Sequence, residues 1–318
     1  MKIVVLDGYT LNPGDLSWDD LEKCGHLKVF ERTAKKEVVL RAKEAEAVFT
    51  NKTVLDERIL RQLPKLRYIG VLATGYNVVD IQIARELGIM VCNVPGYGTP
   101  SVVQHTFALI LELFNHVQQH HESVLRGDWA NSVDFSYWNF PLKELAGKTI
   151  GIIGYGEIGA GVSKVAAAFD MKVVINSRTK RRGLASGLEW LEFEELLRVS
   201  DIVSLHCPLT PDTAGLMNKE RIEMMKPSAF LINTSRGPLI NEADLAIALN
   251  NETIAGAALD VLSSEPPDRS NPLFAAKNCL ITPHIAWASF EARQRLMDIT
   301  VQNFSAFMRG EPRNVIKS

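Results

Sequence analysis

Three ionisable side chains stand where short apolar, strand-like runs of this sequence end. Arg236, Glu265 and His284 each follow such a run. The carboxyl ends of parallel strands meet at one edge of a sheet, which is the edge where open α/β sheets bind ligands. We therefore expect these three side chains to gather at one edge of a parallel sheet.

The three residue types match the needs of a reaction at the carbonyl group of a 2-keto acid. A planar guanidinium such as that of Arg236 can hold the carboxylate and polarise the carbonyl in a fixed geometry. The imidazole of His284 can give a proton to the developing alkoxide near neutral pH. A carboxylate such as Glu265, bonded to the other ring nitrogen, favours the imidazolium form and fixes the ring. The set predicts reversible hydride transfer to a small 2-keto acid.

A glycine-rich turn indicates where the hydride carrier binds. The apolar run 148–153 leads into a GxGxxG pattern formed by Gly154, Gly156 and Gly159, and a helical stretch follows. Strand, glycine turn and helix in this order form the fingerprint of dinucleotide binding. Gly154 permits the tight turn, Gly156 lets backbone amides approach a pyrophosphate, and Gly159 allows the helix to pack closely.

The segment that would contact the adenosine ribose is basic. In NAD-binding domains an Asp or Glu about 20 residues after the glycines accepts a hydrogen bond from the ribose 2′-hydroxyl. This chain has NSRTKRR at 176–182 instead. Ser177, Arg178, Thr179 and Lys180 could bind a 2′-phosphate through charge-assisted hydrogen bonds, so NADP is the expected cofactor. NAD, bound through the ribose by Asn176 or Ser177, is the alternative.

Short apolar runs alternate with helical stretches along most of the chain, which is typical of parallel α/β sheets. A second series of runs begins near residue 149, so the fold class is expected to be α/β with two Rossmann-like, doubly wound parallel-sheet domains. The expected strands are 2–6, 47–50, 67–72, 89–92, 149–153, 172–175, 202–206, 230–233, 255–259 and 279–281.

Proline and glycine residues at 95–100 predict a hinge between the two series. Ser101 is then expected to cap one long amphipathic helix that reaches about residue 125. An aromatic loop follows, with Trp129, Phe135 and Trp138 among its members.

The composition excludes several classes of partner. The chain has 318 residues, a formal net charge of -2 and scattered basic residues, so it has no field that would gather nucleic acid or anionic lipid. Its longest apolar stretches fall short of the roughly 20 residues of a membrane span, and no signal peptide is recognisable. The four cysteines lie far apart without metal-ligand spacing. We expect a cytoplasmic protein without a metal.

Five segments together resemble the D-isomer-specific 2-hydroxyacid dehydrogenase family, and the resemblance covers essentially the whole chain. They are AGKTIGIIGYGEIG at 146–159, HCPLTPDT at 206–213, NTSRG at 233–237, LDVLSSEP at 259–266 and PHIAWAS at 283–289. The resemblance implies that Arg236, Glu265 and His284 are the catalytic set and that Asp260 lies close to the nicotinamide.

The resemblance also implies an architecture. A substrate domain of residues 1–98 and 288–318 would carry an inserted NAD(P)-binding domain of residues 99–287, with the reaction in the cleft between them and water excluded on closure. A homodimer is implied as well, with the helix from Ser101 contributing to its interface.

Further site residues follow from the motifs and the resemblance. The backbone amides of Ala73, Thr74 and Gly75 would receive the substrate carboxylate, together with Arg236 and His284. The implied cofactor-binding residues are Gly154, Gly156, Glu157, Ile158, Gly159, Ser177, Arg178, Thr179, His206, Cys207, Pro208, Thr213, Thr234, Ser235, Asp260, His284 and Ala286.

Four other histidines are not expected to be metal ligands. His105 is in a stretch that by resemblance faces the nicotinamide side. Because no carboxylate or cysteine accompanies them in the sequence, His105, His116, His120 and His121 are expected on a helix surface or at an interface rather than as metal ligands.

Within the family, the runs at 134–138 and 284–288 resemble the glycerate dehydrogenase, or hydroxypyruvate reductase, branch. Hydroxypyruvate and glyoxylate are the substrates that this resemblance implies. Two alternatives stay open: a broad 2-keto acid reductase of the D-lactate type, and a dinucleotide-sensing binding protein without catalytic activity on the same fold.

Overall fold

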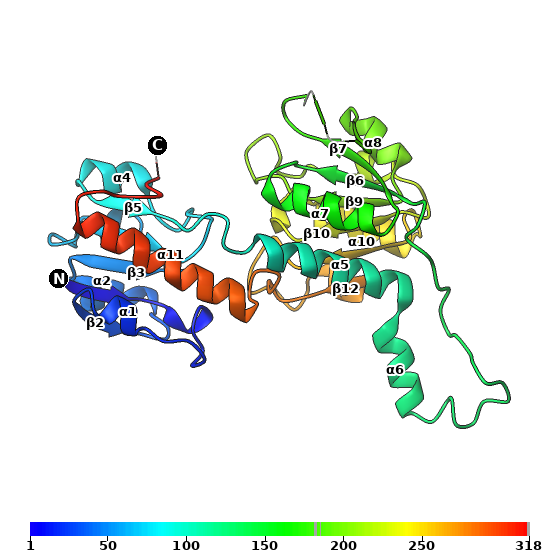
Figure 1. The fold of residues 1–318 in the computed structure, drawn as a ribbon, viewed down its shortest axis with the longest axis horizontal. Coiled ribbons are helices and arrows are strands. Elements are labelled where there is room, and N and C mark those ends of the chain that lie inside the picture. Colours follow the sequence, from blue (N-terminus) through cyan, green and yellow to red (C-terminus); the bar gives the residue numbers. More distant parts are fainter. Residues whose placement is uncertain (181–182, 185, 317–318) are drawn as a thin grey trace. The chain divides into compact units, whose positions relative to one another are not determined.

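The computed structural model describes residues 1–180, 183–184 and 186–316, and it divides into two compact units (Figure 1). Unit 1 is Met1–Gly98 with Ala288–Ser318, and unit 2 is Thr99–Trp287. Each unit is built on one sheet whose named strands pair in parallel. The expected α/β class with two doubly wound parallel sheets is therefore confirmed.

The sheet of unit 1 has five strands in the order β2-β1-β3-β4-β5. The strands are β1 (Lys2–Val5), β2 (His26–Val29), β3 (Ala47–Thr50), β4 (Tyr68–Val71) and β5 (Met90–Cys92). The α-helices are α1 (Asp19–Glu22), α2 (Val38–Ala42), α3 (Glu57–Leu60), α4 (Ile81–Glu86) and α11 (Phe290–Met308), and the 3-10 turns are η1 (Gly8–Thr10) and η2 (Lys35–Glu37).

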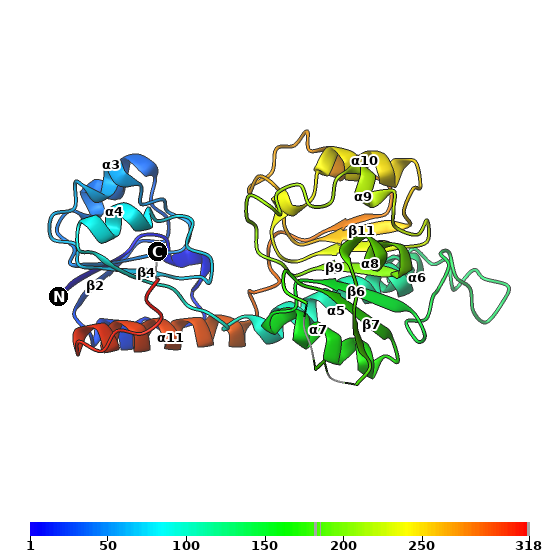
Figure 2. The same ribbon diagram turned by 90° about the horizontal axis from the view of Figure 1, so that it is seen from above.

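Both faces of this sheet are buried under helices. Helices α2, α3 and α4 cover one face, and Figure 2 shows α3 and α4 on the side opposite α11. On the α11 side, the ring of Phe304 packs against Phe49 and Tyr68 at centroid distances of 5.4 and 5.1 Å. All three side chains are fully buried. This aromatic cluster fixes α11, and with it the end of the chain, against strands β3 and β4.

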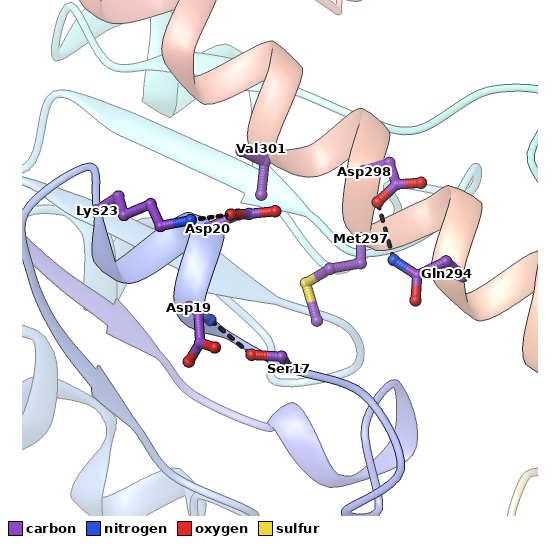
Figure 3. A pocket seen from close by; sticks show the side chains of 8 residues that line it. All are labelled: Ser17, Asp19, Asp20, Lys23, Gln294, Met297, Asp298 and Val301. Atoms are coloured by element: carbon purple, nitrogen blue, oxygen red, sulfur yellow. Dashed lines mark hydrogen bonds and ion pairs between the residues drawn. The ribbon is translucent and has the colours of Figure 1, made fainter.

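A shallow pocket lies where α1 meets α11 (Figure 3). Within its lining, Lys23 Nζ donates to Asp20 Oδ1 at 2.7 Å, and Gln294 Nε2 donates to Asp298 Oδ1 at 2.9 Å.

The sheet of unit 2 has seven strands in the order β12-β11-β10-β9-β6-β7-β8. The strands are β6 (Thr149–Ile153), β7 (Lys172–Asn176), β8 (Leu188–Trp190), β9 (Ile202–Leu205), β10 (Phe230–Asn233), β11 (Gly256–Leu259) and β12 (Cys279–Ile281). The helical elements are α5 (Thr99–Asn115), α6 (Val117–Leu125), α7 (Glu157–Ala168), α8 (Phe193–Val199), α9 (Lys219–Ile222), α10 (Glu242–Asn250), η3 (Gly237–Leu239) and η4 (Pro272–Ala275).

Alternate residues of these strands belong to two separate hydrophobic cores, one on each face of the sheet. Ile150 and Ile152 of β6 face α5 and α7, whereas Ile153 faces α8, α9 and α10. A period of two along a strand sends successive side chains to opposite faces, and both faces here are apolar. The strand order reverses between β6 and β9, and the crevice outside such a switch point is where doubly wound sheets bind nucleotides.

Three local expectations were wrong or incomplete. The edge strands β2 and β8 were not expected at all. The long helix is interrupted at His116, whose φ of 49° separates α5 from α6. Ser101 does not cap it, because α5 begins at Thr99 and the Ser101 hydroxyl donates to the Ala286 carbonyl at 2.6 Å. Within the described residues, no helix combines the length and apolar composition needed to cross a bilayer.

Candidate active site

His284 and Glu265 form a close pair at the carboxyl edge of the unit 2 sheet. His284 Nδ1 lies 2.6 Å from Glu265 Oε2, and the two side chains are 27% and 33% exposed. Because an ionised carboxylate only accepts, Nδ1 carries the proton of this bond. Nε2, the other ring nitrogen, takes no part in this bond.

The backbone of His284 is held in an unusual conformation. Its φ is 54°, in the left-handed region that a residue with a side chain adopts only at a cost. The His284 amide donates to the Asp260 carbonyl at 2.8 Å and also lies 3.0 Å from the Thr282 carbonyl. These bonds aim the ring at the Glu265 loop.

Asp260, which directly follows β11, holds the loop that carries His284 through hydrogen bonds. Its carboxylate accepts from the Thr282 hydroxyl at 2.6 Å and from the amides of Ile285 and Ala286 at 2.9 and 2.8 Å. The residue is only 1% exposed. Burial by itself would raise the pKa of Asp260, but the bonds from His105, Thr282 and the two amides together hold that pKa below its ordinary value.

His105 on α5 belongs to the same network. Its Nε2 lies 3.0 Å from the Thr282 hydroxyl and 3.4 Å from Asp260 Oδ1. Since the Thr282 hydroxyl donates to Asp260, it accepts from His105, so Nε2 carries the proton. The side chain of His105 is 19% exposed, so it is partly buried against the sheet rather than free on the helix surface.

Arg236 extends from the loop after β10 towards solvent. Its guanidinium Nη1 donates to the Ser235 carbonyl at 2.7 Å. The next residue, Gly237, lies directly against the Leu262 and Ser263 backbone, where a Cβ atom would collide. Leu262 in turn donates its amide to Glu265 Oε1 at 3.2 Å. The loops that carry Arg236 and Glu265 are thus in backbone contact.

The glycine turn after β6 has the form of a pyrophosphate cradle. Gly154 has a φ of 94°, and a Cβ there would strike the backbone of His206 and Cys207. A Cβ on Gly159 would strike the Gly154 carbonyl, whereas at Gly156 it would meet nothing within 4 Å among the described residues. Gly156 precedes α7 and makes no side-chain cap, so the first amides of α7 are open to an anion. The turn therefore fits a dinucleotide.

The loop after β9 lies against this glycine turn and is bonded to the loop after β10. The Ser235 hydroxyl donates to the Cys207 carbonyl at 2.8 Å. Thr213 holds its own loop, with its hydroxyl donating to the Pro208 carbonyl at 2.7 Å. Thr234 lies 3.2 Å from the Thr106 hydroxyl of α5 and is buried, so its side chain serves packing in the state described.

His206 and Cys207 are kept uncharged by burial. Burial lowers the pKa of His206 to about 4, and the ring Nε2 lies 2.8 Å from the Ser204 hydroxyl. Burial likewise raises the pKa of the Cys207 thiol to about 11. Both residues therefore present neutral surfaces at neutral pH.

The segment expected to contact the ribose follows β7. The Asn176 amide donates to the Leu191 carbonyl at 2.9 Å, and the Ser177 hydroxyl donates to the Thr179 carbonyl at 2.9 Å. Arg178 and Thr179 are exposed. Arg181 and Arg182 lie outside the described residues.

The expected substrate loop, Ala73 to Gly75, follows β4 in unit 1. The Thr74 hydroxyl donates to the Val94 carbonyl at 2.8 Å, so its proton is already used within the unit. Sequence reasoning missed His105 and Thr282, the side-chain donors to Asp260. The only sequence feature that could have indicated Thr282 is its position directly after β12 and two residues before His284. Among the described residues, no group of three His, Cys, Asp or Glu side chains could hold a metal ion.

Residues 107–286 match the model of the D-isomer specific 2-hydroxyacid dehydrogenase, NAD binding domain. Over 320 residues the chain is 50% identical to the hydroxypyruvate reductase of Blautia hydrogenotrophica, covering 99% of each protein. It is 40% identical to the glycerate dehydrogenase of Methylorubrum extorquens, covering 100% of this chain and 99% of that one. Among solved structures, an acyclic imino acid reductase in complex with NADPH and D-Arg superimposes with a TM-score of 0.88, at 32% identity and full coverage of both chains.

We predict that His206 weakens the fold on mild acidification. Its pKa is about 4 in the folded chain, against 6.5 for an ordinary histidine, so the unfolded chain binds the proton more readily between these values. The contribution of neutral His206 to the free energy of unfolding is complete above pH 6.5. It is lost as the pH falls towards 4, and the total loss is at most about 3 kcal/mol. Urea unfolding of the wild type and of His206→Gln across this range measures it.

The variant should show a flatter dependence of unfolding free energy on pH than the wild type. His26→Gln, which removes an exposed histidine on β2, is the matched control and should keep the wild-type slope. Equal slopes for wild type and His206→Gln would contradict the assignment.

Proposed function

The chain belongs to the D-isomer-specific 2-hydroxyacid dehydrogenase family, and we propose that it reduces hydroxypyruvate and glyoxylate to the corresponding 2-hydroxy acids, or catalyses the reverse reaction. The observation that carries this proposal is the 2.6 Å bond between His284 Nδ1 and Glu265 Oε2. It leaves one ring nitrogen, Nε2, as the proton donor. The names of the two relatives, hydroxypyruvate reductase and glycerate dehydrogenase, support the choice of acid.

When bound in the glycine turn, a reduced nicotinamide would supply the hydride that the carbonyl carbon gains. His284 Nε2 gives its proton to the carbonyl oxygen, so the keto acid gains two electrons and two hydrogens and leaves as the hydroxy acid. Glu265 stabilises the imidazolium before the transfer and keeps the ring in one orientation. In the reverse direction the same nitrogen accepts the hydroxyl proton.

Arg236 supplies the positive charge that the acid requires. Its guanidinium can bind the carboxylate and the carbonyl oxygen together, which fixes the plane of the substrate. The amides of Thr74 and Gly75 are proposed to receive the carboxylate as well. Asp260 has a different part, because its buried carboxylate holds the loop that carries His284.

We propose NADPH as the preferred reductant. The end of β7 has no carboxylate that would repel a 2′-phosphate, and Arg178 is exposed beside Ser177 and Thr179. The solved relative that binds NADPH supports a nicotinamide dinucleotide in this fold. NADH is the alternative that the coenzyme assay distinguishes.

Steady-state oxidation of NADPH and of NADH, each with hydroxypyruvate, glyoxylate and pyruvate, tests the proposed function. Hydroxypyruvate should be turned over fastest. His284→Ala should lower kcat about 10²- to 10⁴-fold while dinucleotide binding is retained, because proton transfer by a positioned side chain contributes about that much. His26→Ala is the matched control and should be unaffected.

Each outcome of this assay has a meaning. Faster turnover of pyruvate would favour the D-lactate type of reductase. Dinucleotide binding without turnover of any of the three acids would reject the enzyme in favour of a binding protein. Full activity in His284→Ala would reject the proton donor.

Arg178→Ala tests the basis of coenzyme choice. If the guanidinium contacts the 2′-phosphate, KM for NADPH should rise about 10- to 100-fold, since a hydrogen bond to a charged group is worth about 1.5–3 kcal/mol. KM for NADH should change little. Arg198→Ala, at an exposed position on α8, is the control. Equal losses for both coenzymes would show that Arg178 does not distinguish them.

We propose that the chain forms a homodimer through the arm, defined as residues 116–144. Figure 1 shows α6 and the following segment extending away from the sheet of unit 2. The arm is built rather than loose: the Trp129 indole donates to the Phe135 carbonyl at 3.0 Å, and the Ser123 and Tyr137 hydroxyls lie 2.6 Å apart. Yet Leu125 and Phe135 are 73% and 91% exposed.

Such a set of exposed apolar side chains on one segment marks an association surface. Phe135→Asp combined with Val133→Asp should convert the dimer to a monomer in sedimentation velocity, because charges would be buried in the interface. Leu40→Asp, at an 81% exposed position on α2 in unit 1, should leave the dimer intact. A monomeric wild type would contradict the proposal.

We also propose that the protein works in the cytoplasm. Its four cysteines, including the buried Cys92 and Cys207, are free thiols. A reducing compartment keeps such thiols unpaired.

A further inference from the structure

The loop after β4 is tied to the segment after β5 by three hydrogen bonds. The Val94 amide donates to the Ala73 carbonyl at 3.0 Å, and the Thr74 hydroxyl donates to the Val94 carbonyl at 2.8 Å. The Asn93 side-chain amide donates to the Thr74 carbonyl at 2.6 Å. Two consecutive carbonyls, those of Ala73 and Thr74, therefore point at residues 93 and 94.

These bonds determine where the next two amides point. In a planar trans peptide the C=O and the following N–H point in opposite directions. With both carbonyls fixed on residues 93 and 94, the N–H groups of Thr74 and Gly75 must point away from them. Among the described residues neither amide has a hydrogen-bond acceptor. The two amides are therefore adjacent donors with fixed directions, and together they can bind an anion.

Two other asparagines bind the backbone of Asn93, one at its carbonyl and one at its N–H group. The buried side chain of Asn303, on α11, donates to the Asn93 carbonyl at 2.9 Å. The Asn93 amide donates to the Asn314 carbonyl at 3.3 Å, and Asn314 Nδ2 donates to Asn303 Oδ1 at 2.9 Å. The bond to Thr74 thus starts from a residue whose backbone is anchored to α11 and to the segment after it.

We propose that Asn93 is a positioning residue for the substrate carboxylate, acting through the peptide plane between Thr74 and Gly75. Asn303 and Asn314 keep it in place. The inference rests on the proposed function, in which the Thr74 and Gly75 amides receive the carboxylate. It adds a residue that touches neither substrate nor cofactor and yet controls how strongly the acid binds.

Asn93→Ala removes the donor and frees this peptide plane to rotate. We expect KM for hydroxypyruvate and glyoxylate to rise about 10-fold, the effect of losing one well-directed bond to a charged group. KM for NADPH should stay unchanged, and kcat should fall far less than KM rises. The Kd of oxamate, an unreducible acid that keeps the carboxylate, should rise by the same factor when titrated into the enzyme with dinucleotide present.

Gln62→Ala is the matched control. Gln62 is an exposed side-chain amide in the same unit that donates to the Arg58 carbonyl at 2.8 Å, and its loss should change neither constant. Asn314→Gly is the second variant in case Asn93→Ala does not fold. It removes the bond to Asn303 at a residue with φ of 52°, which glycine adopts readily, and should shift the oxamate Kd in the same direction by less.

The outcomes separate this inference from the proposed function. Unchanged KM and oxamate Kd in a folded Asn93→Ala would overturn the inference while the enzyme assay of the wild type stands. A merely structural role would lower the melting temperature and kcat with an unchanged oxamate Kd, and it would also overturn the inference. A wild type that binds oxamate without turnover would overturn the function, and the oxamate Kd of the variant would still decide the role of Asn93.

Discussion

The buried carboxylate of Asp260 is the constraint on which the candidate catalytic edge depends. Removing a carboxylate from water costs several kcal/mol unless hydrogen bonds replace the lost hydration. Here the compensating donors come from the loop after β12 and from His105 on α5. The left-handed His284 lies inside this loop and can keep its conformation because the bonds around it over-determine the backbone. Movement of the loop would take the Thr282, Ile285 and Ala286 donors away from a buried charge.

The central strands of both sheets are directly predictable from the sequence, because they are short apolar runs. A strand buried on both faces is largely apolar, and the run Ile150–Gly–Ile–Ile153 of β6 is such a segment. The edge strands lack that signal. In β2 three of the four residues are exposed, so no apolar run exists, and β8 has only three residues. Pairing with a neighbour, rather than composition, makes these segments strands.

The same distinction separates the parts of the site. The glycine turn is local, because its strand, its turn and its helix are consecutive, and the sequence predicts it directly. The grouping of Glu265 with His284 needed a family resemblance or the sheet topology, since short runs alone do not fix which loops meet. The partnership of His105 with Thr282 joins residues 177 apart and depends on how α5 packs on the sheet. Nothing in the spacing of the histidines indicates this partnership, so the sequence alone predicts only a helix-surface or interface position for His105.

The loop that carries His284 and the loop that carries Thr74 are held by side chains of opposite type. An acceptor side chain holds the first loop by its amides, and a donor side chain holds the second by a carbonyl. In unit 2 the acceptor side chain of Asp260 consumes the amides of Ile285 and Ala286, which turns the backbone inward and leaves the His284 ring as the exposed group. In unit 1 the donor side chain of Asn93 binds the Thr74 carbonyl, so the Gly75 amide of the same peptide points away from Asn93. An acceptor at position 93 would oppose the Thr74 carbonyl and could not hold it. A neutral donor there fixes the direction of the Gly75 amide without adding charge. In the proposed function, the formal positive charge that the acid needs would then come from Arg236.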